Sequence, residues 1–193
     1  MVVIKVDDTV HDIEKKLGGL AHKAPKVLAK SINDTAVWAR REIANEVRKT
    51  YTIKLGGFNH DVKIKRANYS HLEAVIQTAG ATFPLNHFKY NVGKRTTTAQ
   101  VLKVGSSKRP LEIDGRRAFY NKISPPGQKG KEHWQLAQRT SNSRLPIKAL
   151  FSNSLPKMVG NEKRVYGIVE PKMEDKLAEQ IEKHIKKVLE GYE

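Results

Sequence analysis

The sequence contains no cysteine, and this absence removes several kinds of chemistry at once. Disulfide bonds, cysteine-ligated zinc sites and a cysteine nucleophile are all excluded. The chain has 193 residues, which is a usual length for one domain and enough to bury a core without disulfides or metals. We therefore expect one domain, residues 1–193, that is held together by hydrophobic burial and needs no cofactor.

Long apolar runs are also missing. No stretch approaches the ~20 consecutive apolar residues that a membrane helix requires. The first ten residues place Asp7 and Asp8 where the apolar part of a signal peptide would run. We expect a protein that is made and kept in the cytoplasm unless a larger assembly carries it out, and that has no membrane partner.

The sequence offers little for catalysis. Its seven histidines are scattered, and none has a metal-ligand spacing such as H-E-x-x-H. There is no glycine-rich phosphate loop and no G-x-S-x-G motif. Glu112 and Asp114 lie two residues apart, but a solvated hairpin end before Gly115 explains them better than a metal site. The sequence therefore favours a protein that is not an enzyme.

Positive charge is abundant, and it is concentrated in the middle of the chain. The formal net charge is +16. Residues 1–50 have 10 Lys and Arg against 7 Asp and Glu, residues 51–164 have 21 against 6, and residues 165–193 have 5 against 7. Such a charge favours a polyanion or an acidic protein nearby, although a solubilising surface would have the same composition.

The candidate contact residues are the basic side chains of this middle segment. Aromatic residues such as Tyr90 and Phe119 interleave with them only weakly. Because phosphate contact requires only well-placed cations, any contact with nucleic acid would be non-specific. The alternative is that these cations are solvated or pair with a neighbouring subunit. The candidates are Lys94, Arg95, Lys103, Lys108, Arg109, Arg116 and Arg117.

Helical periodicity marks both ends of the chain. Ile13, Leu17, Leu20 and Ala24 form one stripe, and Leu28, Ile32, Ala36, Ala39, Ile43 and Val47 form a second. The second stripe predicts a long amphipathic helix from about Pro25 to Thr50, with Trp38 beside it as an anchor. A third stripe, from Met173 to Val188, predicts a helix with Pro171 in its first turn and Gly191 at its end.

Between these helices the sequence has strand character. We expect an antiparallel sheet covered on one face, together with two loops, Gly93–Thr98 and Ser124–Lys131. The whole pattern predicts an α+β fold with a helical part (1–50), a basic β-rich body (51–164) and a C-terminal helix (165–193). The expected strands are Leu72–Thr78, Thr96–Val104, Lys131–Arg139 and Ile147–Phe151.

Seven segments stand out in this order: Leu72–Gly80, Phe83–Phe88, Ala118–Tyr120, His133–Leu136, Arg139–Thr140, Arg144–Phe151 and Ser154–Glu162. Together they resemble the prophage minor tail protein Z family. The most specific part is similar to its run R-L-P-I-x-x-L-(Y/F)-x-x-S-x-P-x-M, although Ser152-Asn153 stands where relatives often have Gly-Pro. The resemblance covers nearly the whole chain, and its motifs are structural rather than chemical.

This resemblance implies a subunit of a ring, commonly a hexamer, at the head-proximal end of a phage tail. Its partners would be further copies of itself, the tail tube protein and the head-tail connector, with transient non-specific contact to DNA in the lumen. A free non-specific DNA-binding protein and a phage enzyme are the alternatives. If the basic segment faces the lumen or an acidic neighbour, changing Lys94, Arg95, Lys108 and Arg109 to Ser should lower the phage titre.

A second set of residues is expected to be structural or to lie at a subunit interface. It consists of Trp38, Arg139, Arg144, Leu145, Pro146 and Ile147. We interpret Arg144–Ile147 as the entry to a strand, because Pro146 forces an extended approach. Leu145 and Ile147 should then face the core. Arg144 should make a local ion pair, worth at most ~1 kcal/mol, or reach a carboxylate across a subunit boundary.

Overall fold

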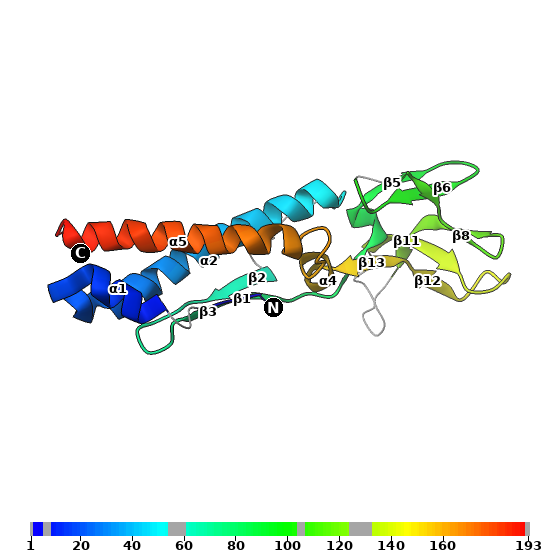
Figure 1. Cartoon of the computed structure of the whole chain (residues 1–193). Helices are drawn as coiled ribbons and strands as arrows, with labels where there is room; N and C mark the ends of the chain where they lie inside the picture. Colours follow the sequence, from blue (N-terminus) through cyan, green and yellow to red (C-terminus); the bar gives the residue numbers. More distant parts are fainter. Residues whose placement is uncertain (1, 6–8, 54–60, 104–106, 124–132, 192–193) are drawn as a thin grey trace. The chain divides into compact units, whose positions relative to one another are not determined.

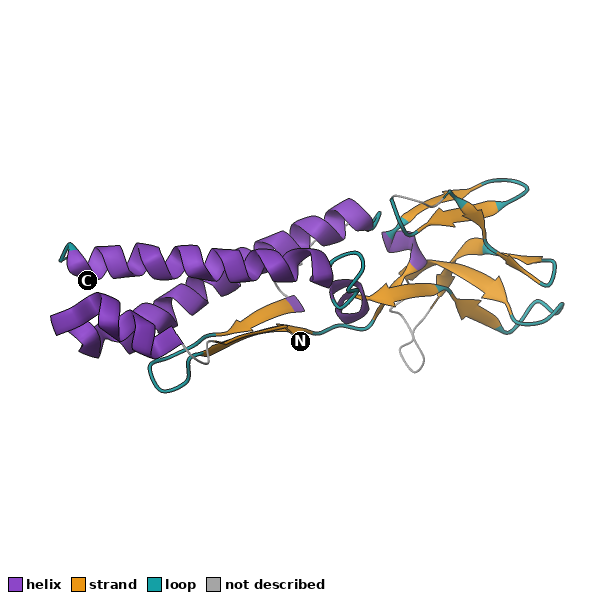
Figure 2. Cartoon of the chain, viewed as in Figure 1, coloured by secondary structure: helices purple, strands orange, loops and turns teal. Residues whose placement is uncertain are grey.

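The computed structural model describes residues 2–5, 9–53, 61–103, 107–123 and 133–191. It confirms the α+β fold: helices lie at both ends of the chain and antiparallel strands lie between them (Figures 1 and 2). The chain forms two compact units. Unit 1 comprises Met1–Glu46, Gly57–Ala79 and Met158–Glu193, and unit 2 comprises Val47–Gly56 and Gly80–Lys157. The three segments expected from the sequence do not coincide with these units, because residues 57–79 belong to unit 1.

Unit 1 contains a three-stranded antiparallel sheet in the order β1-β3-β2. Its strands are β1 (Val2–Lys5), β2 (Val62–Lys65) and β3 (Glu73–Thr78). The expected strand Leu72–Thr78 is confirmed as β3. β1 and β2 were not expected from the sequence. Each has only four residues, and β1 is recognisable mainly through its pairing with a distant strand, in which Val2 lies opposite Ile76.

The N-terminal helices confirm the predicted periodicity. They are α1 (Thr9–Leu17), a 3-10 turn η1 (Gly18–Lys23) and α2 (Ala24–Thr50). Gly18, with a φ of 53°, ends α1, and Pro25 lies in the first turn of α2 as predicted. The predicted stripe on α2 is fully buried: Leu28, Ile32, Ala36, Ala39, Ile43 and Val47 are each 0% exposed.

The C-terminal helix α5 (Tyr166–Leu189) begins earlier than the sequence suggested. Pro171 was expected in its first turn, but it lies inside the helix, five residues after the start. The additional turn is stabilised by Tyr166, whose hydroxyl donates a hydrogen bond of 2.7 Å to Glu170. Gly191 follows the end of α5 with a φ of 78°, which confirms its predicted position.

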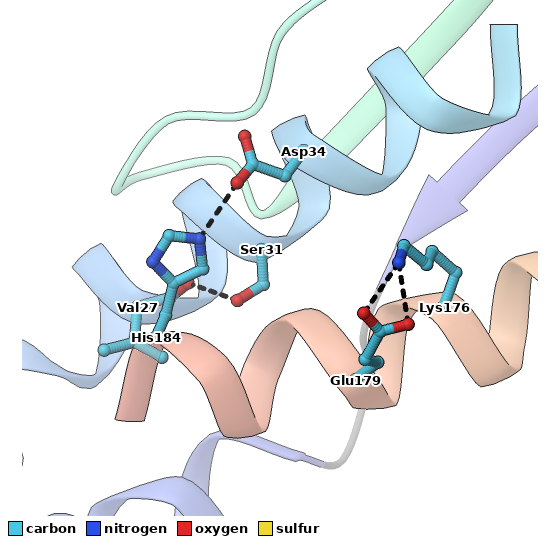
Figure 3. A network of polar contacts seen from close by, with 6 residues as sticks. All are labelled: Val27, Ser31, Asp34, Lys176, Glu179 and His184. Atoms are coloured by element: carbon cyan, nitrogen blue, oxygen red, sulfur yellow. Dashed lines mark hydrogen bonds and ion pairs between the residues drawn. The ribbon is translucent and has the colours of Figure 1, made fainter. Parts of the chain in front are cut away.

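The helices of unit 1 share one hydrophobic cluster, in which Ile13 of α1 and Leu28 of α2 meet Ile185 and Val188 of α5. Polar contacts extend this packing (Figure 3). Nε2 of the buried His184 lies 3.1 Å from a carboxylate oxygen of Asp34, so the pair joins α5 to α2. Burial of the aliphatic side chains, at about 1.5–3 kcal/mol each, is the larger stabilising contribution.

Unit 2 is built from several small antiparallel sheets in the orders β5-β6-β7, β8-β9, β10-β11-β12 and β13-β4. Their core includes Tyr51, Phe88 and Leu136, each no more than 2% exposed. The elements are β4 (Thr82–Pro84), η2 (Leu85–His87), β5 (Lys89–Val92), β6 (Thr97–Gln100), β7 (Arg109–Pro110), β8 (Glu112–Ile113), β9 (Arg116–Arg117), β10 (Phe119–Ile123), β11 (His133–Arg139), β12 (Ile147–Ala149) and β13 (Phe151–Ser154). The helix α4 (Leu155–Val159) follows β13.

Two expected strands are shorter than predicted. The strand expected over Thr96–Val104 ends at Gln100, and Leu102 then forms an isolated bridge with Tyr51. The strand expected over Ile147–Phe151 is interrupted at Leu150, where the chain changes partners from β11 to β4. The strand expected over Lys131–Arg139 is confirmed as β11 from His133, its first described residue, to Arg139. The expected loop Ser124–Lys131 lies outside the described residues.

Candidate functional site

The excess positive charge belongs to unit 2. The residues of unit 2 include 18 Lys and Arg against 3 Asp and Glu, a formal balance of +15. Those of unit 1 include 18 against 17, a balance of +1. Unit 2 is therefore the part of the chain that attracts anions or acidic partners.

A groove of about 570 Å³ in unit 2 is lined by five basic residues of that unit. Three segments line it: the turn between β5 and β6, the segment from β9 into β10, and the chain after β11. No Asp or Glu is among the lining residues. The five cations, which we call the groove cations, are Lys94, Arg95, Arg116, Arg117 and Arg139.

The turn between β5 and β6 holds Lys94 and Arg95 at the groove. The backbone N–H of Gly93 donates to the carbonyl of Thr96 at 3.0 Å, which closes the turn. A Cβ at position 93 would lie 2.9 Å from that same carbonyl oxygen, so the turn requires glycine. Lys94 and Arg95 are both exposed, and their charges are available to a ligand.

A hairpin presents Arg116 and Arg117. It turns at Asp114 and Gly115, whose φ values of 50° and 71° both lie in the left-handed region. This confirms the predicted hairpin end before Gly115. A guanidinium nitrogen of Arg116 donates to Asp114 at 2.6 Å, and Nη1 of Arg117 donates to the carbonyl of Arg95. The second bond ties the hairpin to the β5–β6 turn, so two walls of the groove are linked.

The strand β11 forms the third wall. The side-chain amide of Gln138, only 6% exposed, donates to the carbonyl of Arg116 at 2.6 Å. The next residue, Arg139, lines the groove. Nε of Arg116 is buried and has no hydrogen-bond partner among the described residues.

This arrangement is suited to binding an anion. Guanidinium groups match carboxylate and phosphate oxygens with paired, charge-assisted hydrogen bonds. The hydroxyl groups of Thr96 and Ser141 and the amide of Asn142 add neutral donors to the lining. Within the described residues, no group of three or more His, Asp or Glu side chains is placed to hold a metal ion.

Only four of the seven basic residues predicted as contact candidates line the groove: Lys94, Arg95, Arg116 and Arg117. Lys103 lines a separate cavity of about 490 Å³, with Lys89 and Tyr90. Lys108 and Arg109 are exposed and are not among the lining residues of either cavity. In the sequence, Lys103, Lys108 and Arg109 lie between two of the groove segments, so charge density alone did not separate the two groups.

The second predicted set is placed differently from what was expected. Trp38 is half-buried on α2 in unit 1, and Arg144 is exposed. The prediction that Leu145 faces the core was wrong, because Leu145 is 65% exposed. The N–H of Thr140 donates to the carbonyl of Pro146 at 3.2 Å, which closes a loop from which Leu145 projects. The strand begins only at Ile147, which is half-buried.

Sequence reasoning missed an aromatic stack in unit 2. The rings of Tyr90 and Tyr120 lie 5.9 Å apart, and those of Tyr120 and Trp134 lie 5.2 Å apart, both stacked. Lys122 lies opposite Trp134 in the β10–β11 ladder, and its Nζ is 5.9 Å from the Trp134 ring. Burial, and then the hydrogen bond with Tyr90, raise the pKa of Tyr120. The cross-strand register was the missing information.

Comparison of this chain with protein-family models, with curated proteins and with solved structures finds no match. In the described part of the chain, no helix is long and apolar enough to span a membrane.

Proposed function

We propose that this protein is a non-enzymatic structural subunit of a bacteriophage tail or neck. Copies form a ring, a hexamer as is common for such subunits, at the head-proximal end of the tail. The ring completes the tail and helps to join it to the head, so it contacts the tail tube protein and the head-tail connector. The subunit is assembled in the host cytoplasm and resides in the virion.

The observation that carries this proposal is where the family-like motif lies in the structure. The run from Arg144 to Glu162 builds β12, β13 and α4 in succession. Leu155 and Met158, which belong to its S-x-P-x-M part, are 0% exposed. Buried apolar residues at motif positions belong to the core, so the motif is structural rather than chemical. The resemblance and this burial pattern support the same interpretation.

The positive charge of unit 2 supports the proposed location beside DNA. A ring at this position surrounds the path of the genome, and unit 2 has the charge that phosphates attract. Phosphate contacts of this kind do not depend on sequence, and they weaken as salt rises. Contact with the passing DNA is therefore expected to be transient.

A gene disruption tests the proposal directly. An early stop codon in the phage gene should abolish infectious titre, while heads filled with DNA and free tails accumulate separately. Supplying the intact chain from a plasmid should restore joining. A chain with Leu189→Ala, which changes an exposed side chain, should restore it equally well. Normal titre after the disruption would exclude a role in joining heads to tails.

The groove also favours a second candidate, a free non-specific DNA-binding protein. This candidate requires tight binding of duplex DNA by the isolated chain, with log K falling by about 0.9 per neutralised phosphate for each unit of log salt. Filter binding between low and physiological salt measures that slope. Submicromolar affinity at physiological salt, lost when Lys94 and Arg95 are changed to Ser, would favour this candidate over the ring subunit.

A further inference from the structure

One end of unit 2 combines basic and apolar side chains. We call it the loop end and define it as residues 92–97, 113–117 and 139–145, which include all five groove cations. Three large apolar residues of these segments are exposed: Val92 at 46%, Ile113 at 58% and Leu145 at 65%. Val92 lines the groove itself, and Ile113 is the ladder partner of Arg116.

This combination indicates a protein partner rather than a phosphate backbone. Contact with phosphates requires cations alone. A contiguous exposed apolar patch with a polar rim marks a protein interaction site, and arginine is enriched at protein interfaces. The partner should therefore present carboxylates and apolar side chains side by side.

The same chain has such a surface on the N-terminal half of α5. Ile168, Pro171, Asp175 and Ala178 follow steps of three, four and three, so they share one face of the helix. All four are exposed, and Ile168 is 40% exposed. Glu174, also exposed, lies beside Asp175. The opposite face, with Val169 and Met173, is already buried within the protein.

We propose that the loop end of one copy binds the N-terminal half of α5 of a second copy. The groove cations pair with Glu174 and Asp175, and Val92, Ile113 and Leu145 cover the apolar part of the helix face. This inference rests on the proposed ring, because it names the contact between neighbouring copies. Two different surfaces meeting head to tail generate a ring when the rotation closes.

Charge favours this arrangement over a symmetric one. A contact between two loop ends would bring together two units that each have a formal balance of +15, and like charges across an interface oppose association. The segment 165–193 has 5 Lys and Arg against 7 Asp and Glu. It is therefore the part of the chain best suited to neutralise the groove of another copy.

Cysteine cross-linking tests the contact, because the chain has no cysteine of its own. Full-length Leu145→Cys and Ala178→Cys chains, one of them with a tag, are mixed at high concentration and oxidised. A disulfide-linked dimer of the two different chains is expected. Leu145→Cys mixed with Tyr69→Cys is the matched control. Tyr69 is also 65% exposed, but it lies in unit 1 between β2 and β3, away from α5 in the sequence. This pair should give little cross-linked product.

Charge reversal tests the pairing by loss and recovery of the cross-linking yield, and a misfolded variant would not show the recovery. Lys94→Glu with Arg95→Glu should lower the cross-linking yield by more than about tenfold, and so should Glu174→Lys with Asp175→Lys. A chain with all four changes should recover the yield, because each groove then meets a helix of opposite charge. Failure of the four-fold variant to recover, while it still unfolds cooperatively, would overturn the pairing.

Two further outcomes would also overturn this inference. One comes from a chain that has both Leu145→Cys and Ala178→Cys: a disulfide that forms only within that chain, with no dimer, would count against a contact between copies. The other is the absence of the mixed dimer both in concentrated solution and in purified particles, including the case in which duplex DNA binds the groove instead. If the mixed dimer forms but the chain is missing from virions, the docking inference stands and the proposed function falls.

Discussion

At the scale of single residues, the start of α5 depends on a glycine. A Cβ built at Gly167 would lie 2.4 Å from the carbonyl oxygen of Glu162, which is backbone and cannot move away cheaply. Gly167→Ala should therefore lower the free energy of unfolding by about 1–3 kcal/mol, the usual range for overpacking. Urea unfolding followed by circular dichroism measures it. Gly19→Ala is the control, because nothing lies within 4 Å of its added Cβ. Equal losses in both variants would contradict this explanation.

A second residue-scale prediction concerns alkaline pH. Burial, and then the hydrogen bond to Glu170, raise the pKa of Tyr166 to about 12. Because this pKa is above the unfolded value of about 10, the stabilising contribution of the phenol is complete below pH 10 and is lost between pH 10 and 12. Tyr166→Phe should reduce the fall in stability over that window.

The control for this prediction is Tyr69→Phe, since Tyr69 is 65% exposed. Absorbance at the phenolate band during titration should show one tyrosine fewer in the late-ionising group for Tyr166→Phe. An unchanged late phase in that variant would show that the phenol of Tyr166 ionises with the exposed tyrosines.

At the scale of elements, the packing of α2 against α5 should dominate the stability of unit 1. Leu28 is 0% exposed and shares a hydrophobic cluster with Ile185 and Val188. Leu28→Ala should cost about 2–5 kcal/mol, because it removes buried methyl groups and leaves a cavity. Leu189→Ala, next to Val188 but 56% exposed, should cost less than about 0.5 kcal/mol. Thermal unfolding of both variants tests this, and similar midpoints would contradict the packing described.

The helices were predictable because their period is local. The stripe from Leu28 to Val47 fixes the buried face of α2 without any knowledge of its partner. The two-residue strands β7, β8 and β9 are too short to show a period, and β1 is defined by its pairing with β3, some 70 positions away. Long-range pairing of this kind leaves little trace in the local sequence.

The same distinction applies to the groove. Charge density identified four groove cations from neighbouring parts of the sequence. Arg139 joined them only because Gln138 ties β11 to the hairpin of Arg116. Leu145 was expected in the core since it flanks a proline before a strand, but its loop closes between Thr140 and Pro146 and leaves the side chain in solvent. Neither relationship can be obtained from spacing alone.

At the scale of the whole molecule, the charge difference between the units makes assembly sensitive to salt. Apart from the half-buried Arg116, the groove cations are exposed, as are Glu174 and Asp175 of α5. Pairs of exposed charges are screened once the Debye length falls from about 10 Å at 0.1 M to about 3 Å at 1 M salt. Association of the full-length chain should therefore weaken by at least about tenfold over that range. Sedimentation velocity at several salt concentrations measures this, and association that is unchanged or stronger at 1 M would show that apolar contacts predominate.

The central claim is that the protein is a ring subunit at the junction of tail and head. Image reconstruction of the neck of intact virions tests it most directly, with the chain located by its two units and by the long helices α2 and α5. A ring of copies between the tail tube and the head connector is the predicted result. Absence of the chain from the neck of virions that are otherwise complete would contradict the claim.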